Sequence, residues 1–248
     1  MNASAQRIHD ALQAVAQLRR QHAAEPALAQ ASAKIKRFQA RRFQATYADL
    51  LQSPRYKPAA GFFLHELYSD KDFADRDEQF GKIANTIAKL FPQAIVDTAA
   101  ALAEVHALTE HLDDLMARQW LLSVSSAVQV NICAAYIDCW RRVADPAGRH
   151  RQLEVVLILG RELDRLTKKP GLRTMLRLMR GPAAAAGLGV LQQFLETGFD
   201  AFAGMRGADE FLQLVRQRET KSINSLFEDD FVTCETALKQ LVGSDAGQ

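Results

Sequence analysis

The chain has 248 residues, of which 48% are hydrophobic and 24% charged, and its formal net charge is only +2. This composition is that of a globular protein with a real core, and it excludes a wholly disordered chain. The small net charge excludes the strong positive field with which basic proteins attract nucleic acid or anionic lipid, so we expect neither partner.

The start of the chain and its cysteines predict a cytoplasmic protein. Residues 1–7 lack the apolar run of a secretory signal peptide. The three cysteines (Cys133, Cys139 and Cys234) have no metal-ligand spacing, and an odd number cannot all pair within one chain. A reducing compartment is the simplest explanation. The sequence identifies no cofactor.

Seven prolines divide the chain into segments with helical periodicity. Proline removes a backbone donor and clashes with the preceding turn, so helices begin or end near it. Between the prolines, apolar residues recur every three or four positions, as in Ile8, Leu12 and Val15, and no segment alternates with a period of two. The sequence therefore predicts an all-α protein, an irregular bundle of about eight to ten helices without a sheet. We expect a single domain over residues 1–248, with a disordered tail at about 243–248.

The first group of candidate site residues consists of five polar side chains on two neighbouring predicted helices: His65, Glu66, Tyr68, Arg76 and Asp77. An acid, a histidine and a tyrosine close together could transfer a proton or hold a polar ligand. The structural alternative is that Phe63 packs inward and Arg76 pairs with Asp72 one helical turn away.

The segment 104–114 carries a second polar group: Glu104, His106, Glu110, His111, Asp113 and Asp114. Bundles that bind two metal ions use Glu-x-x-His pairs on inward faces, and this spacing is absent here. On a helical wheel the buried stripe runs through Val105, Leu108 and Leu112, on the side away from the polar group. We therefore expect a solvated polar face and no metal site.

Residues 120–137 contain no charged side chain, and this length is near the threshold of about 18 residues for a membrane span. However, polar residues such as Ser123, Gln129 and Asn131 interrupt the run. The prediction is a central, most buried helix of the bundle, preferred over a membrane helix.

Arginines at helical spacing mark the region before Pro182. Arg173, Arg177 and Arg180 fall on one helical face, and after the Gly-Pro break a new helix opens among small residues that include Gly187 and Gly189. Free amides at a helix N-terminus can bind a phosphate or carboxylate, with arginines as bidentate partners. The alternatives are close helix packing through the small residues and a solvated arginine face.

Charge is arranged in blocks along the chain. Residues 1–64 and 141–180 each carry a net charge of +7, residues 65–114 carry −7 and residues 181–248 carry −5. The blocks predict that oppositely charged helices lie side by side. A basic run within the first block gives the best argument for nucleic-acid binding, but no helix-turn-helix pattern follows it: Lys34, Lys36, Arg37, Arg41 and Arg42.

Two stretches have a distinctive pattern: residues 61–68, GFFLHELY, followed by Arg76-Asp77, and residues 178–202, LMRGPAAAAGLGVLQQFLETGFDAF. Together they resemble a family of uncharacterised helical bacterial proteins, over most of the chain between residues 50 and 215. The resemblance implies a bacterial cytoplasmic protein and carries no activity.

We therefore expect a binding or interaction module. Its helices would form a pocket or groove for a small anionic or amphipathic ligand, or for a protein partner, with the arginines before Pro182 as the binding groups. One alternative is a metal- or cofactor-assisted enzyme that uses the His65 cluster and the 104–114 helix. Another is a structural subunit that assembles with itself, for example as a homodimer.

Overall fold

The computed structural model describes residues 2–66, 71, 73–90, 92–124 and 131–243. These residues contain no strand, and none of their helices is long and apolar enough to cross a membrane. The all-α prediction is confirmed for the described part of the chain. Apart from Gly243, the expected tail at 243–248 lies outside it. The helices are α1 (Ala3–Ala24), α2 (Pro26–Thr46), α3 (Ala48–Gln52), α4 (Lys57–Glu66), α5 (Ala74–Leu90), α6 (Gln93–Val124), α7 (Ile132–Val143), α8 (Pro146–Thr167), α9 (Leu172–Leu178), α10 (Arg180–Ala185), α11 (Gly189–Met205), α12 (Asp209–Glu228) and α13 (Phe231–Val242).

The prolines mark helix boundaries as predicted. Pro26 and Pro146 each occupy the first position of a helix, where a missing N–H costs no hydrogen bond. At the start of α8, the side chain of Asp145 accepts a hydrogen bond from the Gly148 amide at 2.8 Å. This carboxylate caps the helix by satisfying an amide that has no partner within it.

The predicted number of helices is wrong, because the described residues contain more than eight to ten. Pro182 has no N–H to donate to the carbonyl of Leu178, and the chain accordingly breaks into α9 and α10 near that carbonyl. A second break separates α12 from α13. Asp230 accepts a hydrogen bond from the Thr233 amide at 3.0 Å and starts α13 as a separate helix.

The single helix expected over residues 120–137 is wrong as well. α6 ends at Val124, α7 begins at Ile132, and residues 125–130 lie outside the described residues. The side chain of Asn131 accepts a hydrogen bond from the Ala134 amide at 3.3 Å, which is the N-cap of a new helix. The central position belongs to α6, which starts 27 residues earlier than predicted and is 32 residues long.

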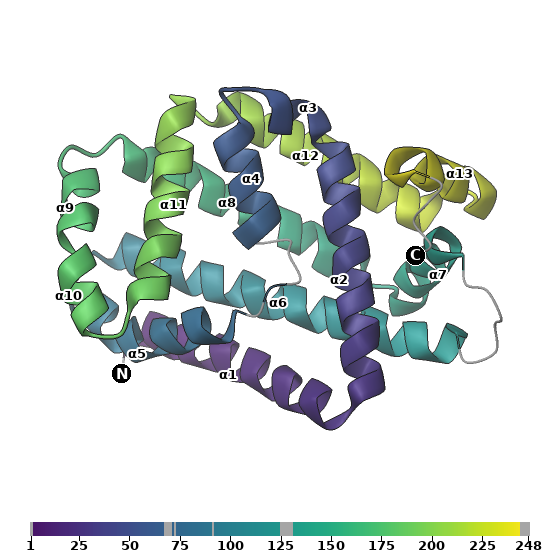
Figure 1. Cartoon of the computed structure of the whole chain (residues 1–248), viewed down its shortest axis with the longest axis horizontal. Helices are drawn as coiled ribbons and strands as arrows, with labels where there is room; N and C mark the ends of the chain where they lie inside the picture. Colours follow the sequence, from purple (N-terminus) through teal and green to yellow (C-terminus); the bar gives the residue numbers. More distant parts are fainter. Residues whose placement is uncertain (1, 67–70, 72, 91, 125–130, 244–248) are drawn as a thin grey trace.

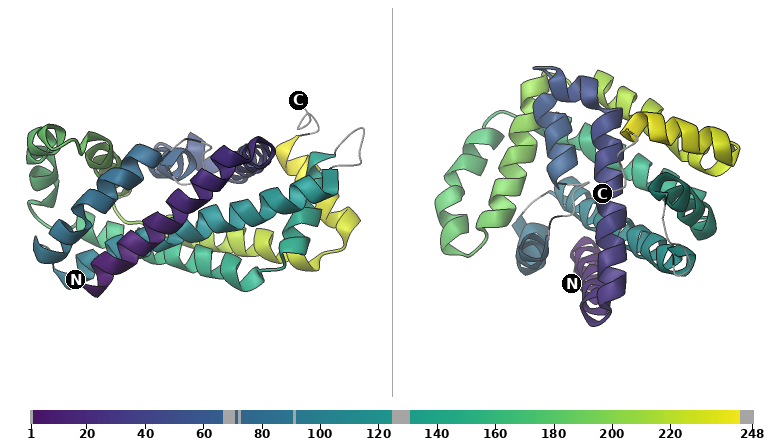
Figure 2. Two further views of the ribbon diagram at one scale, coloured as in Figure 1. Left: turned by 90° about the horizontal axis from the view of Figure 1, so that it is seen from below. Right: turned by 45° about the vertical axis from the view of Figure 1, so that its right-hand side comes forward.

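α6 is the axis around which the other helices pack (Figure 1). α1, α2, α5, α7 and α8 all contact it, and the two views of Figure 2 show helices on several sides of it. The buried apolar residues form one continuous cluster, from Ile8 in α1 to Leu238 in α13. By contrast, α9 and α10 lie at the edge of the molecule, where they contact mainly each other and α11.

Candidate functional site

The arginines predicted to bind an anion lie on the edge formed by α9, α10 and α11, and all three are exposed. Two of them already have acidic partners on α11. Arg173 Nε lies 2.8 Å from Asp200 Oδ1, and Arg180 Nε lies 2.8 Å from Glu196 Oε2. Hydrogen bonds from Arg180 lower the pKa of Glu196 to about 2, so this partner is a carboxylate at any physiological pH.

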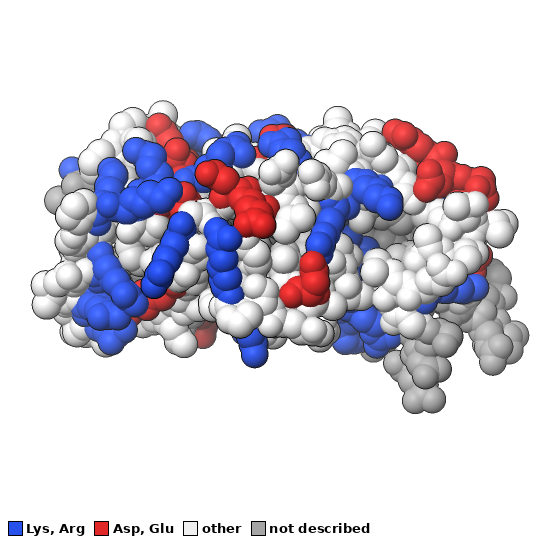
Figure 3. Space-filling model, turned by 90° about the horizontal axis from the view of Figure 1, so that it is seen from above, with Lys and Arg blue, Asp and Glu red and all other residues white. Residues whose placement is uncertain are grey.

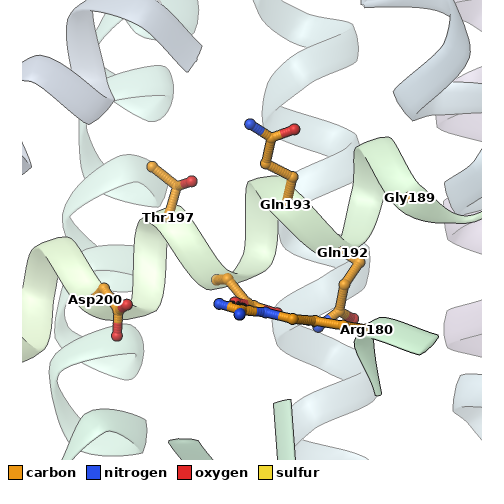
Figure 4. A pocket seen from close by; sticks show the side chains of 7 residues that line it. Arg180, Gly189, Gln192, Gln193, Thr197 and Asp200 are labelled. Carbon is orange, nitrogen blue, oxygen red and sulfur yellow. Dashed lines mark hydrogen bonds and ion pairs between the residues drawn. The ribbon is translucent and has the colours of Figure 1, made fainter. Parts of the chain in front are cut away.

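An open hollow of about 400 Å³ lies beside these ion pairs, between α10 and the outer side of α11 (Figure 4). Figure 4 shows the Arg180 side chain lying along α11 beside Gln192. The hollow is lined by one arginine, two carboxylates and uncharged residues: Arg180, Gly189, Gln192, Gln193, Glu196, Thr197 and Asp200. Gly187 is not among them. Because the lining carries a net negative charge, it does not attract an anion. The anion site therefore stays a prediction.

The outer side of the same edge is apolar. Five of the ten large hydrophobic side chains that are exposed in the described residues belong to α9, α11 or the turn after α9: Met175, Leu178, Met179, Val190 and Leu195. On α9 the inner side carries Leu172 and Leu176, which are half-buried. Met175, Leu178 and Met179 are spaced i, i+3 and i+4 and are 40%, 72% and 47% exposed. We call these three residues the α9 apolar ridge.

The sequence contained part of the signal for this ridge. In the segment LRTMLRLM, four apolar residues share one helical stripe, and Leu178 is an additional apolar residue outside it. Periodicity therefore marks Leu178 alone as an apolar residue outside the stripe, whereas the exposure of Met175 and Met179 depends on what packs beside α9.

The polar cluster predicted around His65 is only partly assembled. Tyr68 lies outside the described residues, and His65 is exposed. Arg76 and Asp77 are buried, with 3.5 Å between Arg76 Nη2 and Asp77 Oδ1. Arg76 also donates a hydrogen bond at 3.1 Å to the backbone carbonyl of Glu66, so its guanidinium links α5 to the end of α4. Phe63 packs inward as expected, whereas Asp72 lies outside the described residues.

Asp77 has two partners that the prediction did not include. Arg19 Nη2 in α1 lies 2.6 Å from Asp77 Oδ2, and His106 Nε2 in α6 lies 2.9 Å from the same oxygen. Burial opposes ionisation of Asp77, but His106 and the two arginines outweigh it and lower the pKa of the carboxyl. The three elements are far apart in the sequence, so no local spacing could have predicted this cluster.

The expected solvated face of the 104–114 segment is wrong. Asp113 and Asp114 are almost fully buried, because α1 and α2 pack on this side of α6. Asp114 Oδ1 lies 2.9 Å from His22 Nε2, and Lys36 Nζ lies 2.7 Å from Glu110 Oε1. The described residues contain no group of three or more His, Cys, Asp or Glu that could hold a metal ion.

A buried ion pair joins α2 to α12. Arg42 Nη2 donates a hydrogen bond to Glu219 Oε2 at 2.8 Å, and the Tyr47 hydroxyl donates one to Glu219 Oε1 at 2.9 Å. Although burial lowers the pKa of Arg42, Glu219 and nearby tyrosines hold it above the ordinary value. This pair and the Lys36–Glu110 pair take two cations away from the basic run considered for nucleic acid.

Comparison with protein families gives a match over most of the chain. The profile of a protein family described as a domain of unknown function (DUF8198) matches residues 18–232. No curated protein and no solved structure matches the chain.

Proposed function

Because the chain belongs to the DUF8198 family, whose description assigns no function, we propose from its geometry that it is a protein-interaction module. The partner binds the α9 apolar ridge, Met175, Leu178 and Met179. The observation that carries the proposal is the 72% exposure of Leu178 between two other exposed apolar side chains. Contiguous exposed apolar side chains on a protein surface commonly mark an interaction site.

The chemistry of the ridge suits a protein partner better than a small ligand. Burying one large apolar side chain contributes about 1.5–3 kcal/mol, so three adjacent ones provide useful binding energy without a deep pocket. Methionine and arginine are both enriched at protein interfaces, and arginines flank the ridge. The adjacent hollow is open and its charges are already paired, which favours a surface contact.

Site-specific photocrosslinking tests the proposal. A benzophenone amino acid is placed at Leu178 in the full chain, produced in the cells that naturally contain it. The matched control carries the same amino acid at Leu122, which is 71% exposed and lies in α6, far from the ridge. We expect discrete protein adducts from position 178 after irradiation and none of the same mass from position 122.

Two further observations decide the result. Met175→Gln, in a chain that carries the crosslinker at 178, should reduce the adduct, because it removes a neighbouring contact without changing the charge. Equal adducts from positions 178 and 122, or no adduct from 178, would overturn the proposal.

A further inference from the structure

The end of the molecule opposite to α9 carries an acidic corner. Glu228, Asp229 and Asp230 are consecutive and exposed where α12 meets α13, and none of them forms an ion pair with a described residue. Two exposed apolar residues follow them directly, Phe231 and Val232, and Val232 is 69% exposed. We call these five residues the α13 corner.

The α9 apolar ridge has the opposite charge around it. Lys169 and Arg177 flank it, are exposed and form no ion pair with a described residue. Residues 161–180, from α8 to the start of α10, contain seven Lys or Arg, of which Arg165, Lys168, Arg173 and Arg180 are paired with acids. Beside the ridge, Lys169 and Arg177 carry positive charges without an acidic partner among the described residues. The corner has three carboxylates without a basic partner there, although the Arg141 guanidinium lies over Phe231 and donates a hydrogen bond to the Asp229 carbonyl.

The two surfaces cannot meet within one molecule. α9 and α13 lie at opposite ends of the long axis (Figure 1). Figure 3 shows one group of acidic side chains at the α13 end of the face it presents, whereas acidic and basic side chains are mixed over the rest of that face. Matching apolar patches with opposite surrounding charge favour contact between two separate molecules.

We infer that the partner of the α9 apolar ridge is a second copy of this chain, bound through its α13 corner. The inference rests on the proposed function and names the partner. The contact is head-to-tail, so each copy has one free ridge and one free corner, and further copies can add. Because both patches are small and charged, association is weak and becomes weaker as salt screens the charges.

Sedimentation velocity of the full chain over a range of concentrations tests the inference. We expect the sedimentation coefficient to rise with concentration and to rise less at high salt. Leu178→Gln and Val232→Gln should each weaken association about tenfold or more, because each removes one apolar contact without adding charge. Leu122→Gln, at an equally exposed position outside both surfaces, should change nothing.

Mixing the two variants distinguishes head-to-tail from symmetric contact. The Leu178→Gln chain keeps its corner and the Val232→Gln chain keeps its ridge, so the mixture should regain one native contact and stop at dimers. Circular dichroism checks that both variants retain the helical fold. If only Leu178→Gln weakens association and mixing restores nothing, the contact is symmetric and the inference is overturned.

A wild-type chain that stays monomeric at every concentration also overturns the inference. In that case the crosslink at Leu178 still tests the proposed function separately. Its adduct would then contain a different protein. An adduct of twice the mass of the chain supports both.

Discussion

Asp113 illustrates how burial changes a single side chain. It lies inside the bundle at 3% exposure, and Gln39 Nε2 donates a hydrogen bond to its Oδ1 at 3.0 Å. Burial raises the pKa of this carboxyl, and the attraction of Lys36 and Arg149 does not fully compensate. The folded state therefore holds the proton more tightly than the unfolded chain does.

The raised pKa gives a pH-dependent prediction for Asp113→Asn. In the wild type, stability falls as pH rises from the ordinary aspartate pKa through the raised folded value, because unfolding there releases the bound proton. The Asp113→Asn variant has no titrating group at this position, so it does not lose stability over this pH range. Its side-chain oxygen can still accept the hydrogen bond from Gln39. We expect it to be more stable than the wild type above that window and equal to it below. Urea unfolding at several pH values measures this difference, and a variant less stable at neutral pH would contradict the prediction.

The sequence could predict which residues of α6 are polar, but not what covers them. Periodicity placed Asp113 and Asp114 on one side of the helix, and an outer helix would expose that side to water. Here α1 and α2 cover it, and His22 and Lys36 provide partners for the carboxylates. Long-range packing decides whether such a face is solvated, and periodicity within one helix contains no information about it.

Gly198 allows α11 to pack closely against α4. A Cβ added there would lie 2.9 Å from Phe62 Cζ in α4, and Phe62 is itself packed against Phe194 with 5.4 Å between ring centroids. Gly204 lies on the same helix, and a Cβ there would meet no atom within 4 Å. The two glycines therefore offer a matched test of helix propensity and packing.

We expect opposite effects of alanine at these two positions. Gly204→Ala should raise the free energy of unfolding by up to about 1 kcal/mol, because alanine loses less backbone entropy in a helix. Gly198→Ala has the same entropic gain, but the clash with Phe62 should make the variant less stable by about 1–3 kcal/mol. Denaturant unfolding of both variants gives the comparison. Equal stabilisation by the two substitutions would show that α4 and α11 do not approach as closely as described.

At the scale of helices, the sequence predicted the strongest boundaries and missed the weaker ones. Pro26 and Pro146 identified helix starts because proline restricts its own backbone and removes a donor. The start of α13 depends on the single capping carboxylate of Asp230, in a segment whose apolar spacing continues across the break. A single cap contributes only a small free energy. Tertiary contacts therefore decide whether the helix ends at the cap or continues through it.

At the scale of the whole molecule, the blocks of charge were the most informative feature of the sequence. The prediction that oppositely charged blocks lie side by side is confirmed by ion pairs between them. Residues 1–64 pair with residues 65–114, as in Lys36–Glu110, and residues 141–180 pair with residues 181–248, as in Arg173–Asp200. The individual partners could not be predicted. A charged block indicates the sign of the charge on the segment beside it, but not which residues of the two segments come into contact.

The same architecture predicts an uneven distribution of local stability. α6 is covered by five helices, whereas α9 has no buried residue and α10 buries only Ala183. Segments with few buried apolar contacts open at low free energy, so amides in residues 172–188 should exchange with deuterium much faster than those in residues 100–120. Hydrogen–deuterium exchange with mass spectrometry measures both segments in one experiment, and similar protection would contradict this picture. If α9 docks against another copy, exchange in residues 172–188 should also slow as protein concentration rises, while residues 100–120 remain unchanged. An interaction surface on the most weakly held helices would thus become ordered by the contact it makes.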